Sequence, residues 1–296
     1  MRLNKLGVWT TYHAIGEENA AESARLVESL GYGTFWLGGS PRLSEVRPLL
    51  EATELLTIAT GIVNIWQNEP AALAAEYAAL AGEFPGRLLL GIGVGHPEAT
   101  SDYAKPLTAM RAFLDGLDAA RPPVPPEARC LAALGPKMLE LSAERSLGAI
   151  PYFTSVEHTR FARTRLGKGA LLAPELACVL DADLERGRAT ARKYAKLYLG
   201  LRNYTSNLLR FGFTAQDIAD GGSDALIDAI VPSGSAEAIC EVVDRHLRAG
   251  ADHVCVQPVG APGIPREQWT ALAAEIVAQV TARPSTQAPP LDGRRS

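Results

Sequence analysis

The chain has 296 residues, of which 47% are hydrophobic, and a formal net charge of −4, so it is long enough for one α/β barrel of about 250 residues or for two smaller domains. The acidic balance argues against a nucleic-acid-binding surface, which needs Lys and Arg clustered on one face. With no apolar run near the ~18 residues of a membrane span, no signal-peptide pattern and four widely spaced cysteines, the sequence predicts a reduced, cytoplasmic protein that does not enter a membrane.

Eight strand signals follow one another along the chain, and amphipathic helical patterns separate most of them. The first helical stripe runs from Ala20 to Leu30 and ends at Gly31, and the last runs from Trp269 to Val280. Eight successive β-then-α units predict a closed, parallel (β/α)₈ barrel, with a doubly wound open sheet as the alternative. The predicted strands are Leu6–Thr11, Thr34–Leu37, Thr57–Ile65, Leu88–Gly93, Arg129–Leu134, Ala149–Phe153, Ala177–Leu180 and His253–Pro258.

The unit between Leu56 and His96 is the most informative part of this pattern. Two apolar runs flank a helical pattern over Pro70–Gly82, and a right-handed crossover of this length makes the two strands parallel. Neither run alternates, so both faces of each strand are expected to be covered. The runs end in Asn64 and in Gly93–His96. Because chemistry in parallel α/β sheets lies at the carboxyl edge, we expect functional residues there.

The pattern predicts one barrel domain over residues 1–282. The segment Arg202–Ser223 interrupts the alternation and is too apolar for disorder, so it is interpreted as an insertion over the barrel mouth. Residues 283–296 are rich in Pro, Ser and Gln and are predicted to be disordered.

Three segments resemble the signatures of the bacterial luciferase-like superfamily of flavin and deazaflavin oxidoreductases. The first is Phe84–Gly95, with the sequence Phe-Pro-Gly-Arg-Leu-Leu-Leu-Gly-Ile-Gly-Val-Gly. The second is Leu131–Met138, and the third combines Pro232–Ser235 with Gly250–Val254. Their order and spacing match over nearly all of the chain and are closest to the branch that uses the deazaflavin coenzyme F420. The resemblance implies a barrel with an insertion, a homodimer, and a cofactor at the carboxyl ends of the strands.

The resemblance also implies where the cofactor binds. It places a non-prolyl cis peptide at Gly61–Ile62, with Ile62–Val63 as the second choice. It places the cofactor phosphate at Leu134-Gly135 and Thr154-Ser155. A glycine turn that opens a helix would present free amides to the anion, and the hydroxyl pair would complete the site. A competing phosphate site is Ser233–Ser235, although Ser235 also fits the N-cap of the next helix. The expected cofactor contacts are Gly61, Ile62, Asn64, Gly95, Leu134, Gly135, Thr154 and Ser155.

Two departures from the family pattern bear on the reaction. In sugar- and alcohol-oxidising deazaflavin enzymes the second strand ends in an Asp-His pair and the fourth in Glu, whereas here those positions read Gly38-Gly39-Ser40 and His96. The missing base favours reduction of an unsaturated or imine substrate over alcohol oxidation. His96 is the predicted proton donor, since histidine titrates near working pH; the alternative is that it packs on the cofactor or caps a helix. The aromatic residues expected to wall the substrate are Trp9, Tyr12, Trp66, Tyr152 and Tyr204.

These features predict an F420-dependent oxidoreductase that moves a hydride between the deazaflavin ring and a small organic substrate. One alternative is an FMN-dependent luciferase-like monooxygenase, which would need a flavin reductase as partner. Another is a cofactor-binding protein without catalysis. The sequence has no H-E-x-x-H, no G-x-S-x-G and no carboxylate cluster, so we expect no metal, esterase or glycosidase site.

Overall fold

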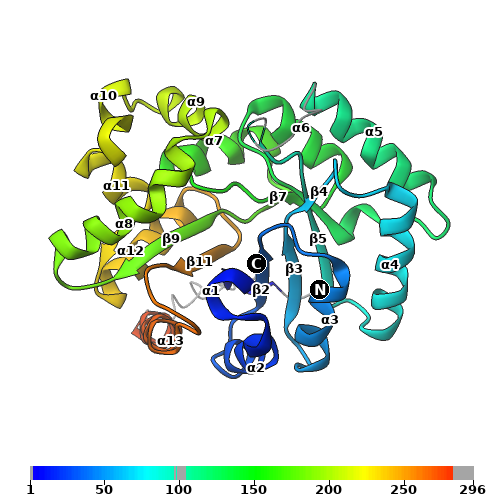
Figure 1. Cartoon of the computed structure of the whole chain (residues 1–296), viewed down its shortest axis with the longest axis horizontal. Coiled ribbons are helices and arrows are strands. Elements are labelled where there is room, and N and C mark those ends of the chain that lie inside the picture. The colour runs from blue at the N-terminus through cyan, green and yellow to red at the C-terminus, as the bar shows by residue number, and fades with distance from the viewer. Residues whose placement is uncertain (1–2, 97, 99–104, 283–296) are drawn as a thin grey trace, which may run out of the picture.

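The computed structural model describes residues 3–96, 98 and 105–282, with side chains up to residue 275, and it shows a ring of parallel strands surrounded by helices (Figure 1). Each strand pairs in parallel with its neighbours, and the sheet order is β10-β9-β11-β1-β2-β3-β5-β6-β7-β8, with β4 on β5. The strands are β1 Leu6–Thr11, β2 Thr34–Gly38, β3 Thr57–Gly61, β4 Val63–Asn64, β5 Leu88–Gly93, β6 Arg129–Leu131, β7 Gly148–Ala149, β8 Leu171–Leu172, β9 Glu175–Leu180, β10 Ser233–Gly234 and β11 Val254–Pro258.

The barrel closes through two consecutive strands, β8 and β9. On one side β8 pairs with β7, and the Glu175 N–H donates to the Pro151 carbonyl. On the other side β9 pairs with β11, and the Cys255 N–H donates to the Pro174 carbonyl. The eight core positions are therefore β1, β2, β3, β5, β6, β7, β8 with β9, and β11. The predicted (β/α)₈ barrel is confirmed, and the open-sheet alternative is wrong.

Amphipathic helices cover the outside of the barrel, as their apolar spacing predicted. In α2 the residues Ala20, Ala24 and Val27 are buried, and Gly31 with a φ of +83° follows the helix end. The helices are α1 Tyr12–Ile15, α2 Ala20–Ser29, α3 Leu43–Glu51, α4 Pro70–Glu83, α5 Pro106–Ala119, α6 Pro136–Arg145, α7 Val156–Leu166, α8 Leu184–Leu199, α9 Arg202–Arg210, α10 Ala215–Ile218, α11 Asp224–Ile230, α12 Ala236–Arg248 and α13 Arg266–Ala282, with short 3-10 turns at Glu17–Asn19, Pro126–Ala128 and Ala219–Gly221.

Several strands are shorter than predicted at their carboxyl ends. β6 ends at Leu131 and β7 at Ala149, because the apolar residues that follow leave the sheet ladder and turn into loops. The predicted strand Thr57–Ile65 is two pieces, β3 and β4, separated at Ile62. The strand β8 was not predicted, since its two residues give no readable alternation. These loops carry most of the site described below.

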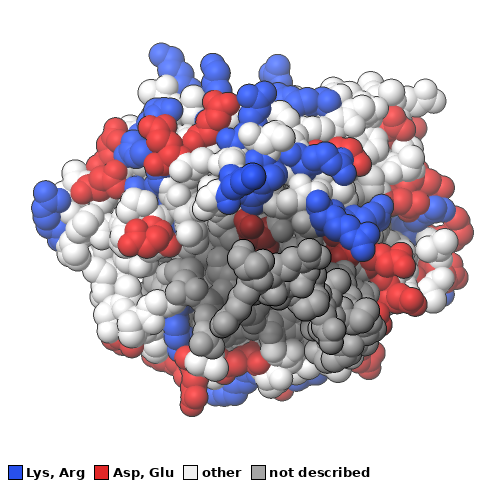
Figure 2. Space-filling view, turned by 180° about the vertical axis from the view of Figure 1, so that it is seen from behind, with Lys and Arg blue, Asp and Glu red and all other residues white. Residues whose placement is uncertain are grey.

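The segment Arg202–Ser223 folds as α9, α10 and a 3-10 turn beside α8 and α11 (Figure 1). Tyr204 and Leu208 of α9 pack with buried residues of α8, β9 and α11 in one apolar cluster. Residues 283–296 lie outside the described residues. Within the described part of the chain, no helix has the length and apolarity needed to span a membrane. On the face in Figure 2, acidic and basic side chains are interspersed over the described surface.

Candidate functional site

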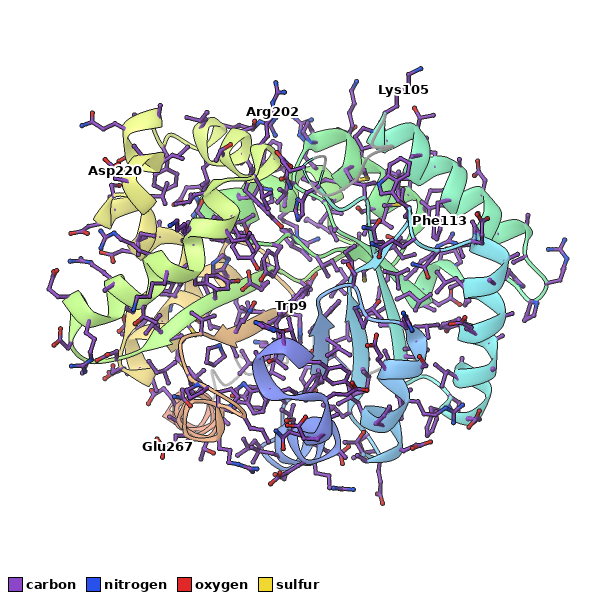
Figure 3. The ribbon with its side chains drawn as sticks, viewed as in Figure 1. Trp9, Lys105, Phe113, Arg202, Asp220 and Glu267 are labelled. Atoms are coloured by element: carbon purple, nitrogen blue, oxygen red, sulfur yellow. The ribbon has the colours of Figure 1, made fainter. Side chains whose placement is uncertain are left out.

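A cavity of about 510 Å³ opens at the carboxyl ends of the strands, which is within the 300–1,000 Å³ of typical small-molecule sites. Trp9, at the middle of the barrel in Figure 3, forms part of its wall. Among the described residues, the lining contains aromatic, aliphatic and neutral polar side chains with His96, and no Asp, Glu, Lys or Arg. An ionic group buried there would have no charged partner, so the cavity suits an uncharged ligand.

Most of the predicted site residues meet in this cavity. Those that line it are Trp9, Gly61, Ile62, Asn64, Gly95, His96, Leu134, Gly135, Tyr152 and Tyr204. Four others are not part of the lining. They are Tyr12, Trp66, Thr154 and Ser155.

The end of β1 explains why glycines stand at the ends of β2 and β3. A β-carbon on Gly61 would overlap the six-membered ring of Trp9, and one on Gly38 would lie 2.7 Å from Trp9 Nε1. The indole therefore occupies the space that larger side chains at either position would need. The cis peptide that the resemblance placed at Gly61–Ile62 is present at that bond.

His96 follows β5 and is half-buried at the cavity wall. Its Nδ1 lies 3.1 Å from Asn203 Oδ1 at the start of α9, and its ring centroid lies 5.3 Å from that of Tyr204. Because an amide oxygen only accepts hydrogen bonds, this contact places a proton on Nδ1. Nε2 of the neutral ring is then an acceptor, and it donates a proton only from the protonated ring.

Two predicted substrate residues have structural partners instead. The Trp66 indole N–H donates to the Val94 carbonyl at 2.8 Å, and the Trp66 backbone N–H donates to Asn64 Oδ1 at 3.0 Å. The Tyr12 hydroxyl donates to the Glu45 carbonyl, and burial raises the pKa of Tyr12 to about 12. These hydrogen bonds connect neighbouring segments beside the cavity, α1 with α3 through Tyr12 and the loop after β4 with the loop after β5 through Trp66.

The predicted phosphate segments lie at the start of two helices. Gly135 is the N-cap of α6 without a side-chain cap, and a β-carbon there would meet open space. The Thr154 hydroxyl is buried and has no hydrogen-bond partner among the described residues. Ser155 instead caps α7, since its hydroxyl accepts the His158 N–H at 3.4 Å. The open amides of α6 and the unused Thr154 hydroxyl are groups that fit an oxyanion.

The alternative phosphate segment has a clear structural role at one of its residues. The Ser235 hydroxyl accepts the Ala238 N–H at 3.2 Å and caps α12, as its sequence position also predicted. The Ser233 hydroxyl is buried without a hydrogen-bond partner among the described residues, but it lies outside the cavity lining.

A group of hydroxyls where α8 packs beside the cavity was not identified from the sequence. The hydroxyls of Tyr194 and Tyr198 of α8 lie within hydrogen-bond distance of the Tyr152 hydroxyl. Gln257 Oε1 of β11 accepts from Tyr152 and Tyr194. The two helix positions are one turn apart, and this (i, i+4) spacing in an otherwise charged helix was the available signal.

Glu175 at the start of β9 was also missed, because it precedes the apolar run that marked the strand. It is 1% exposed, and its Oε2 accepts the Phe153 N–H at 3.2 Å while Oε1 has no partner among the described residues. Burial raises the pKa of this carboxyl to about 8, and the hydrogen bond from Phe153 only partly opposes that rise. Glu175 is therefore a neutral acid below that pH.

Comparison with known proteins gives a consistent result. The sequence model of luciferase-like monooxygenases matches residues 2–253. Among curated protein sequences none matches significantly. The solved structures with a similar fold include an F420-dependent secondary alcohol dehydrogenase (TM-score 0.72, 15% identity, 94% of this chain and 99% of that one). The F420-dependent tetrahydromethanopterin reductase from Methanopyrus kandleri is similar too (TM-score 0.68, 15% identity, 94% and 99%).

A monooxygenase has a similar fold at a comparable TM-score. The EDTA monooxygenase from Chelativorans sp. BNC1 aligns with a TM-score of 0.70 at 12% identity, over 94% of each chain. At such identities these likenesses establish a shared fold, and the choice of cofactor has to be argued from the residues.

Proposed function

Since the chain belongs to the luciferase-like monooxygenase family, we propose that it is a deazaflavin-dependent oxidoreductase that reduces a small, uncharged organic substrate. Members of this fold include enzymes that use F420 and enzymes that oxygenate substrates. When bound, a deazaflavin supplies or accepts a hydride at one ring carbon. The residues of this chain would bind the ring, exclude water and supply the accompanying proton.

One observation carries the proposal: an uncharged cavity of about 510 Å³ adjoins the uncapped start of α6. A neutral tricyclic ring fits a cavity without Asp, Glu, Lys or Arg in its described lining, whereas the phosphate of the same molecule needs hydrogen-bond donors. Gly135 and the unpartnered Thr154 hydroxyl are such donors. Trp9, Gly61 and Ile62 would form the surface against which the ring lies.

The proposed direction rests on the resemblance to the deazaflavin enzymes. In those that oxidise alcohols the base stands at the end of the second strand, where this chain has Gly38, Gly39 and Ser40. Reduction needs a proton, and the protonated ring of His96, held by Asn203 through Nδ1, would donate it from Nε2. The alternative is an FMN-dependent monooxygenase, which would bind its flavin ring in the same cavity.

A charge placed at the start of α6 tests the site. Gly135→Asp adds a carboxylate where the phosphate would bind, and the β-carbon meets open space, so the fold should tolerate it. F420 affinity, followed by quenching of its fluorescence, should fall by orders of magnitude. Gly169→Asp is the matched control, because Gly169 is exposed, also faces open space and lies outside the cavity lining. Equal F420 affinity in both variants would show that the phosphate binds elsewhere, with Ser233–Ser235 as the next site.

We also propose that the protein is a homodimer. The helix α4 exposes small side chains at Ala71, Ala72, Ala75 and Ala79, which permit close helix packing. Sedimentation at micromolar concentration should give twice the chain mass of 31.5 kDa; a monomer mass would contradict it.

A further inference from the structure

Three tyrosine hydroxyls and an amide oxygen form a hydrogen-bonded group that the proposed function does not use. The Tyr152 hydroxyl lies 2.6 Å from Tyr194 Oη, 3.0 Å from Tyr198 Oη and 3.0 Å from Gln257 Oε1. The Tyr194 hydroxyl lies 3.3 Å from the same amide oxygen. We call these four residues the tyrosine network. Tyr152 and Tyr198 line the cavity, and Tyr194 and Gln257 lie behind them.

The protons of the network can be arranged in two directions. In one, each hydroxyl donates inward, from Tyr198 to Tyr152, on to Tyr194 and finally to Gln257 Oε1. In the other, Tyr194 donates to Tyr152 and Tyr152 to Tyr198, so the Tyr198 proton is free for a ligand. Both arrangements keep the two bonds between tyrosines, and successive bonds polarise one another. Tyr198 can therefore offer a strengthened donor to the cavity while both bonds between tyrosines are kept, at the cost of the hydrogen bond that Gln257 Oε1 accepts from Tyr194 in the first arrangement.

The protonation states of the tyrosine network and of Glu175 favour an electron-rich ligand atom. Burial raises the pKa values of Tyr152, Tyr194 and Tyr198, so all three remain protonated donors. Glu175 acts on the same tyrosines electrostatically, and because its own pKa is raised to about 8 it carries no negative charge at neutral pH. An electron-rich oxygen or nitrogen near Tyr198 is then not repelled.

Aromatic rings surround Tyr198 at the cavity wall. The Trp9 and Tyr152 ring centroids are 5.1 Å apart with planes inclined at 49°, and the Tyr204 centroid lies 5.5 Å from that of Tyr198 and 5.3 Å from that of His96. These rings give the organic part of a ligand an apolar surface to pack against.

We propose that the tyrosine network binds the carbonyl oxygen or imine nitrogen of the substrate through the Tyr198 hydroxyl, and that the substrate is an uncharged carbonyl or imine compound. The inference rests on the proposed function and extends it by naming the substrate class. Reduction of a carbonyl or imine builds negative charge on its heteroatom. A donor already aimed at that atom by Tyr152 stabilises the charge as it develops.

The test uses the full-length protein without cofactor and acetophenone labelled with ¹³C at its carbonyl. Binding to the wild-type protein should move the carbonyl signal downfield, as a hydrogen bond to the oxygen requires. Tyr198→Phe should weaken acetophenone binding about tenfold, the value of one good hydrogen bond, and remove the downfield shift. Tyr152→Phe should leave a smaller shift, because Tyr198 then loses its donor. Tyr77→Phe is the control, since this hydroxyl belongs to α4 outside the cavity lining and its loss should change neither quantity.

Two outcomes would overturn the inference. The first is an unchanged shift and affinity in Tyr198→Phe. The second is full displacement of acetophenone by F420, which would assign the network to the cofactor ring instead of the substrate. A failure of the proposed function looks different: the wild-type protein would not bind F420, while the acetophenone shift and its loss in Tyr198→Phe would persist.

Discussion

The six-membered ring of Trp9 fills the space in which a side chain on Gly61 would begin. Gly61→Ala should therefore force the indole or the end of β3 to move, which costs about 1–3 kcal/mol in an overpacked core. Chemical denaturation should show this loss in the free energy of unfolding. F420 affinity should fall as well, because both residues line the cavity.

A control and a rescue separate this contact from a general effect of alanine. Gly82→Ala, on the exposed side of α4 with nothing near its β-carbon, should be neutral or stabilise the protein by about 0.5–1 kcal/mol. Adding Trp9→Phe to Gly61→Ala should return part of the lost stability, since the smaller ring makes room. Additive effects of the two changes would contradict the account of their contact.

The proton-donor role of His96 predicts a loss of turnover with little loss of cofactor. His96→Ala should lower turnover about 10²–10⁴-fold and change F420 affinity only a few-fold. His96→Gln keeps a polar side chain but no titratable proton, so it should be as slow as His96→Ala. If both variants turn over at the wild-type rate, His96 only packs against Tyr204, and the proton comes from elsewhere.

The Thr154 hydroxyl should matter for ligand binding and not for folding. Thr154→Val removes a buried hydroxyl without a partner among the described residues, so the free energy of unfolding should stay constant or rise by about 1 kcal/mol. F420 binding should weaken, since a phosphate would lose a donor. Ser155→Ala should have the opposite effects: the free energy of unfolding should fall by about 1 kcal/mol through loss of the α7 cap, and F420 affinity should not change. Unchanged F420 affinity in Thr154→Val would remove Thr154 from the site.

Because of Glu175, we expect the free energy of unfolding to fall as the pH rises. Its carboxyl has an ordinary pKa of 4.5 and a folded-state pKa of about 8, so the folded protein holds this proton more tightly than the unfolded chain. The contribution is complete below about pH 4.5 and is lost as the pH rises through 8. Denaturation of Glu175→Gln across this range should lack that fall, while the exposed Glu157→Gln should retain it. Parallel pH profiles for Glu175→Gln and the wild-type protein would contradict the assignment.

The barrel itself could be predicted because its evidence is repetitive. Strand runs such as Leu88–Gly93 and helix stripes such as Ala20 to Leu30 each repeat a burial pattern that only a covered parallel sheet satisfies. Short strands were harder to predict: Leu171–Leu172 was missed because two residues show no period, and the strand predicted at Ala149–Phe153 is only Gly148–Ala149. Their pairing depends on neighbours distant in sequence.

The site was predictable on the side where glycine and aromatic residues end the strands. Trp9, Gly61 and His96 meet as expected because parallel strands bring their carboxyl ends to one edge. The wall that α8 contributes was not predictable, since Tyr198 reaches the cavity only through the tertiary packing of that helix, with Tyr194 behind it. Tyr12 and Trp66 followed strand ends equally well, but their hydrogen bonds to Glu45 and Val94 hold them in the loops.

The choice of cofactor is tested most directly by equilibrium titration of the purified protein with F420 and with FMN under the same conditions. The account predicts that F420 fluorescence is quenched at micromolar or lower protein concentration, and that FMN binds at least about tenfold more weakly, a difference of about 1.4 kcal/mol. Tighter binding of FMN, or no binding of F420, would contradict a deazaflavin-dependent oxidoreductase and favour the oxygenating branch of the family.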